Sequence, residues 1–137
     1  MTFVLDDIAD YLASGGVGTV GTSIFKGGMF DGGTAATPDA QVAVYEYLGP
    51  APQQVFGSGV ASPTVSPRVQ VVCRDVKYSD ARTKAQAVYA RLAPVTDVTI
   101  NSTRYLRIEA LGEPSFIGSD QNGRPLIGCN YGVLREQ

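Results

Sequence analysis

The sequence predicts an α+β fold: a mainly antiparallel sheet of about five to six strands with two helices packed on one face. Three observations predict it. Two segments carry apolar residues at intervals of three and four, as amphipathic helices do. Other apolar segments alternate with polar residues, as strands do. Glycine, proline and asparagine clusters separate these segments in the order helix, three strands, helix, three strands.

The first helix is expected near the start of the chain. Its apolar residues recur at helical spacing: Leu5, Ile8, Ala9 and Leu12. Acidic residues crowd the same turns, where the helix dipole favours negative charge, and are expected to face away from the apolar side: Asp6, Asp7 and Asp10. Gly15 and Gly16 then end this helix.

Three strands are expected before the second helix, at 23–26, 41–48 and 68–74. The 41–48 segment alternates in a way that predicts partial cover on both faces. The segment 49–67 between the second and third strands carries four prolines and three glycines. It is long for a connection inside a compact domain, which predicts a projecting arm.

The second helix is expected to be capped by Ser79 and to end at Ala93 and Pro94. Its apolar positions are Ala81, Ala85, Val88, Tyr89 and Leu92. A strand with Val98 and Ile100 then turns at 101–102 into the strand 105–111. In that strand one face is predicted to carry Leu106, Ile108 and Ala110, and the other Tyr105, Arg107 and Glu109. A Gly/Pro/Ser-rich link, 112–118, leads to a closing strand that opens at Pro125 and has Ile127, Cys129, Tyr131 and Val133 on one face.

Length and composition predict one domain, 1–137. A formal charge of −2 argues against a protein that grips nucleic acid, because such binding depends on clustered Lys and Arg. Neither a signal peptide nor an apolar run long enough to span a membrane is recognisable. Cys73 and Cys129 lie in apolar strand patterns, which predicts buried free thiols in a soluble protein made in a reducing cytoplasm.

No pattern of catalytic residues is found. The chain has no histidine, which removes histidine-dependent triads and the common zinc motifs. Gly16–Gly21 fits GxGxxG, but it follows a helix and precedes a strand, the reverse of the dinucleotide-binding order. The basic side of the second helix, with Arg82, Lys84 and Arg91, is read as solvated, or alternatively as a contact with an acidic partner. We therefore expect no enzyme, no cofactor and no metal.

Several segments resemble the tail terminator (minor capsid) proteins of long-tailed bacteriophages. They are the 5–12 helix, the 42–47 strand, the 67–72 strand leading into an alanine-rich helix, and the Asp120-x-x-Gly123-Arg124-Pro125 turn and strand. The resemblance implies a structural virion protein that forms a hexameric ring on the head-proximal end of the tail tube. It would stop tube polymerisation and join tail to head in the neck, after assembly in the host cytoplasm.

The implied partners are further copies of the chain, the tail tube protein and a head-side stopper or connector protein. DNA would pass through the lumen without specific binding, and no membrane is involved. Apolar residues in two expected loops are candidate contacts with a neighbour or the tube: Val55, Phe56, Val60, Met29 and Phe30. Folding of Phe56 back onto its own sheet stays open, as do two other functions: a head-completion, stopper or adaptor protein of the neck, and a small monomeric binding module.

Overall fold

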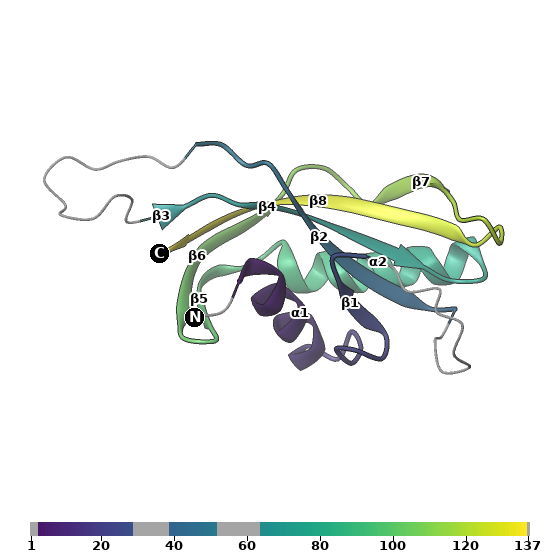
Figure 1. Ribbon diagram of the computed structural model, residues 1–137, viewed down its shortest axis with the longest axis horizontal. Coiled ribbons are helices and arrows are strands. Elements are labelled where there is room, and N and C mark those ends of the chain that lie inside the picture. The colour runs from purple at the N-terminus through teal and green to yellow at the C-terminus, as the bar shows by residue number, and fades with distance from the viewer. Residues whose placement is uncertain (1–2, 29–38, 52–63, 137) are drawn as a thin grey trace, which may run out of the picture.

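The computed structural model describes residues 3–28, 39–51 and 64–136. Within these residues the chain forms two helices and eight strands, and both helices lie on one side of the sheet (Figure 1). The predicted α+β class, with its order of helices and main strands, is confirmed. The elements are α1 Val4–Ser14, β1 Ile24–Lys26, β2 Gln41–Tyr47, β3 Thr64–Val65, β4 Arg68–Arg74, α2 Tyr78–Leu92, β5 Thr96–Ile100, β6 Thr103–Ala110, β7 Ser115–Ser119 and β8 Pro125–Glu136.

The sheet is built around β8, and its main path runs β1-β2-β4-β8-β6-β5. The two strands off this path also pair with β8: β7 beside its first residues and β3 beside its last. The β1–β2 pair is parallel, whereas the other strand pairs of the described residues are antiparallel. β8 is therefore the strand that joins the two halves of the sheet.

The core lies between the sheet and the two helices. The predicted faces of the helices are buried there: Ile8, Ala9 and Leu12 from α1, and Ala81, Ala85, Val88 and Leu92 from α2. The predicted face of β8 meets them with Ile127, Cys129, Tyr131 and Val133. Both cysteines are buried and free, as expected, and burial raises the pKa of the Cys73 thiol to about 12.

Two predictions about local structure are wrong. Ser79 does not cap α2: the helix begins at Tyr78 after Lys77, so Ser79 lies in its first turn, where its carbonyl accepts the Thr83 hydroxyl proton. The expected link 112–118 overlaps β7, Ser115–Ser119, whose register shifts by one residue between Phe116 and Gly118. The positive φ of Gly118, 138°, accommodates this bulge, since a glycine tolerates such backbone angles.

The predicted alternation in β6 also fails, because the strand contains a bulge between Tyr105 and Arg107. Strict alternation would put Tyr105 and Ile108 on opposite faces. The extra residue brings both side chains to the helix side, where each is buried. The preceding turn is as predicted: Asn101 and Ser102 have φ of 48° and 67°, as both central residues of a type I′ hairpin do.

Candidate assembly surfaces

The face of the sheet opposite the helices, here called the outer face, offers the surface that a partner could reach. The register places Tyr47, Arg68, Gly132 and Glu109 side by side in one row across β2, β4, β8 and β6. Within the described residues, both helices lie on the other face (Figure 1). The outer face is therefore a candidate surface for contacts with another protein.

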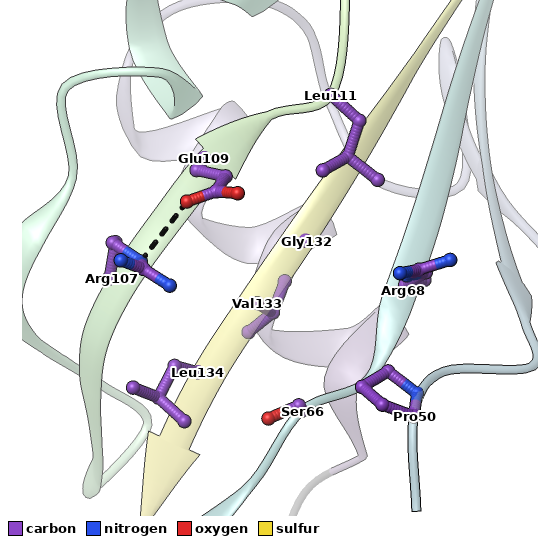
Figure 2. Close-up of a pocket in the computed structure, with 9 residues that line it drawn as sticks. All are labelled: Pro50, Ser66, Arg68, Arg107, Glu109, Leu111, Gly132, Val133 and Leu134. Carbon is purple, nitrogen blue, oxygen red and sulfur yellow. Dashed lines mark ion pairs between the residues drawn. The ribbon is translucent and has the colours of Figure 1, made fainter.

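A trough crosses the outer face over β8 (Figure 2). Arg68 stands on one side and Arg107 with Glu109 on the other, with Gly132 between them at the base. The volume of the trough is about 160 Å³. The Arg107–Glu109 ion pair, 3.3 Å long, is about half exposed and is worth little to stability. Because Gly132 lacks a side chain, backbone forms part of the base of the trough.

An exposed segment, Leu48–Pro50, borders the trough where β2 ends. Leu48 is 91% exposed, while Pro50 and Ser66 line the trough itself. Gly49 packs directly against the backbone of the returning chain: an added Cβ would collide with the Ser66 carbonyl oxygen and lie 3.3 Å from the Pro67 Cα. Glycine at 49 is what lets the two segments run this close.

We expect Gly49→Ala to destabilise the protein by about 2 kcal/mol, because the added methyl group meets backbone that cannot rotate away. Urea unfolding measures the change. Gly112→Ala is the matched control, since an added Cβ there meets nothing within 4 Å. Equal stability of the two variants would contradict the close approach at Gly49.

A second exposed cluster lies beyond the other end of β4. It contains Val76, Tyr78 and Phe116, which are 57%, 52% and 55% exposed. The Tyr78 and Phe116 rings meet edge to face, with centroids 6.3 Å apart. Lys77, between Val76 and Tyr78, and Asp80, in the first turn of α2, are exposed as well. We call Val76, Tyr78 and Phe116 the Tyr78 patch. Large apolar side chains grouped on a surface mark contact sites for other proteins.

The β7–β8 turn is held by Asp120. One carboxylate oxygen accepts the backbone N–H groups of Asn122 and Arg124, and the other accepts the Arg124 side chain at 2.7 Å. The latter oxygen is also 3.5 Å from Nη1 of Arg74, a side chain that is fully buried. Arg124 reaches on to Asp39, 2.9 Å away. This network, the Asp120 turn, fixes the Asp120-x-x-Gly123-Arg124-Pro125 motif against β4.

A second polar cluster joins α1 to the β5–β6 hairpin. Asp7 is fully buried, which contradicts the expectation that it faces away from the core. Its carboxylate accepts the Tyr105 hydroxyl and the Asn101 amide, the latter at 3.0 Å, and lies 3.6 Å from Arg135. Burial first, and then the hydrogen bond to Asp7, raise the pKa of Tyr105 well above its ordinary value, so the phenol stays protonated and donates.

Two of the arginines expected on a solvated helix face bond within the protein instead. Arg91 donates to the Tyr11 carbonyl at 3.0 Å and to the Ser14 hydroxyl at 2.8 Å, and its guanidinium lies 3.7 Å from the centre of the Tyr11 ring. It thereby satisfies the carboxyl end of α1. Arg82 donates to the Pro114 carbonyl. Neither group is held ready for an acidic partner.

The candidate contact residues of the two loops lie outside the described residues: Val55, Phe56, Val60, Met29 and Phe30. Their role stays a prediction, as does the projecting arm 49–67, of which only the two ends are described. The Leu48 and Tyr78 surfaces were not foreseen. The only sequence signal for them is apolar residues flanking strand ends, a signal that core residues share.

The described residues hold no group of three or more His, Cys, Asp or Glu side chains that could bind a metal ion. No helix in the same part of the chain is long and apolar enough to cross a membrane. The carboxylates of Asp7 and Asp120 each accept several hydrogen bonds from the protein itself, which supports the fold.

Comparisons with known proteins identify a matching family and a similar fold. The family model described as bacteriophage tail terminator protein matches residues 11–136. A chain from a solved structure described as the virion of a native gene transfer agent particle has a similar fold, with a TM-score of 0.62. The two chains are 13% identical, and the match covers 98% of this chain and 95% of the other. No curated protein sequence matches the chain.

Proposed function

Because the chain belongs to the bacteriophage tail terminator family, and so is a structural protein of phage tails, we propose that it forms a hexameric ring on the head-proximal end of a tail tube. The ring ends polymerisation of the tube and joins the tail to the head through the neck. The tail tube protein and a head-side stopper or connector protein are its partners, and DNA crosses its lumen without specific binding.

The observation that carries this proposal is the family match, which extends over nearly the whole chain. The fold resemblance to a chain of a gene transfer agent virion supports it. Exposed apolar side chains at both ends of β4 also support it, because a ring subunit needs two different contact surfaces that close after a fixed rotation. The action is by assembly, without catalytic turnover.

Tube length is the direct test of the proposal. Purified tail tube protein is polymerised with and without the chain, and the lengths of the tubes are measured by electron microscopy. The chain is expected to limit tube length and to be found at one tube end only. An unchanged length distribution, with no chain at the tube ends, would refute the terminator function.

Light scattering and negative-stain imaging test the ring itself. The expected particle is a closed ring with a mass of roughly six times 14.4 kDa. A twelve-fold ring would favour an adaptor on the head side instead. A hexamer located in the neck but absent from tube ends would favour a stopper, and a chain that stays monomeric and does not bind tails would favour a small binding module.

A further inference from the structure

The Asp120 turn contains the pair Asn122-Gly123, which has a reactivity of its own. In such a pair the backbone nitrogen of the glycine gives up its proton and attacks the Cγ carbon of the asparagine side chain. The attack closes a cyclic succinimide, and the side-chain nitrogen leaves as ammonia. Water then opens the ring at either carbonyl group, which leaves aspartate or isoaspartate in place of asparagine. Glycine carries no side chain that could shield the attacking nitrogen, so an Asn-Gly pair reacts readily.

Both residues of this pair are open to water. Asn122 and Gly123 are exposed in the turn between β7 and β8. The φ of Gly123 is 76°, a backbone angle that residues with a side chain rarely adopt. The turn therefore favours a glycine directly after Asn122, and the fold keeps the reactive pair.

The two other asparagines of the chain are protected by their surroundings. Asn130 lies within β8 and precedes Tyr131, whose side chain hinders attack by its backbone nitrogen. The Asn101 amide donates to the Asp7 and Asp10 carboxylates, 3.0 and 2.8 Å away, and these bonds hold the side chain in place. Both residues therefore serve as internal comparisons.

The hydrogen bonds of the turn restrain the reaction. The attacking nitrogen, that of Gly123, donates to the Asp120 carbonyl group at 3.0 Å. The Asn122 N–H donates to the Asp120 carboxylate at 3.0 Å, and the Arg124 side chain holds the same carboxylate. Succinimide formation needs these bonds to open, so its rate follows the fraction of molecules in which the turn is open.

We propose that Asn122 is a site of spontaneous deamidation and that the Asp120 carboxylate slows the reaction by keeping the turn closed. The reaction needs only water and does not depend on the proposed ring. It adds a negative charge to the turn that already contains Asp120. In the isoaspartate product the main chain is also longer by one carbon, which disturbs the spacing on which the Asp120 hydrogen bonds depend.

Peptide mapping of the purified 137-residue chain tests the site. The protein is incubated in mildly alkaline buffer, and mass spectrometry follows the conversion of each asparagine with time. Asn122 is expected to deamidate at least about tenfold faster than Asn101 or Asn130 in the folded chain, and faster again in urea, where the turn is lost. An Asn122 that is preserved as well as Asn130 would overturn the site. Equal rates in the folded and the unfolded chain would overturn the protection.

Two substitutions separate opening of the turn from unfolding of the whole protein. Asp120→Ala removes acceptors from the turn and is expected to speed deamidation at least about tenfold. Asp120→Asn, which keeps the shape of the side chain and loses the charge, should speed it to a smaller extent. Asp7→Ala is the control, because Asp7 acts beside Arg135 near the last residues of β8, whereas the turn precedes the first.

The control variant is expected to change the deamidation rate by less than about threefold, since it weakens the fold away from the turn. Each variant is compared under conditions in which circular dichroism shows it to be folded. If the Asp120 variants react no faster than the original chain, or if Asp7→Ala accelerates the reaction equally, the Asp120 carboxylate does not control it.

Discussion

Asp7→Ala is expected to destabilise the protein by about 4 kcal/mol, the largest loss that we expect from a single substitution. The substitution removes the acceptor for Tyr105 and Asn101 and leaves the Arg135 guanidinium without its buried partner. Each of these groups is then desolvated without compensation. Thermal and urea unfolding of the variant measure the loss, and α1 should separate first from the β5–β6 hairpin.

Asp10→Ala is the matched control for Asp7→Ala. Asp10 lies one turn along the same helix and accepts the same Asn101 amide at 2.8 Å, but it is exposed. We expect a change within about 1 kcal/mol for this variant. If the two substitutions lowered the free energy of unfolding equally, burial of Asp7 would not be the source of its effect.

Asp120→Ala is expected to lower the free energy of unfolding by about 3 kcal/mol. The variant removes the carboxylate that lies beside the buried Arg74 and that accepts the Arg124 side chain and two backbone N–H groups of the turn. Urea unfolding measures the loss. Asp39→Ala is the comparison. The exposed Asp39 carboxylate binds Arg124 but none of the other groups that Asp120 binds, so its removal should lower the free energy of unfolding far less.

The same carboxylate gives the protein an acid-sensitive stability. Burial acts to raise the pKa of Asp120, but the backbone N–H groups of Arg124 and Asn122 and then the Arg124 guanidinium outweigh it, so the pKa lies below its ordinary 3.8. A lowered pKa stabilises the folded state at pH values above the ordinary pKa. This stabilisation is lost as the pH falls through the lowered pKa of the folded state. The stability difference between the original chain and Asp120→Asn should therefore be large at about pH 7 and shrink as the pH falls below the ordinary 3.8. A difference that stays constant with pH would contradict this account.

The main elements could be predicted from the sequence because each is specified by its own residues. Leu5 to Leu12 repeats at helical spacing, and Ile127 to Val133 alternates, so both faces are readable without knowledge of their neighbours. What could not be read depends on residues far apart in the chain. Asp7 is buried because Tyr105, nearly a hundred positions later, supplies its donor.

The failures have the same cause. Nothing in Tyr105–Arg107 itself signals a bulge, which arises because β6 must match the register of β8. Likewise β7 exists because the first residues of β8 offer it a free edge. The Tyr78 patch needs the start of α2 and β7 to be placed together, and no single segment contains that information.

The central position of β8 has a consequence for synthesis. Of the ten elements in the described residues, this strand is synthesised last, yet it pairs with β3, β4, β6 and β7. A nascent chain that lacks residues after Pro125 consequently has two separate half-sheets, β1-β2-β4 and β6-β5, each with an open edge. Such long-range pairing delays folding until translation has passed Glu136. Products truncated before β8 therefore cannot complete the sheet.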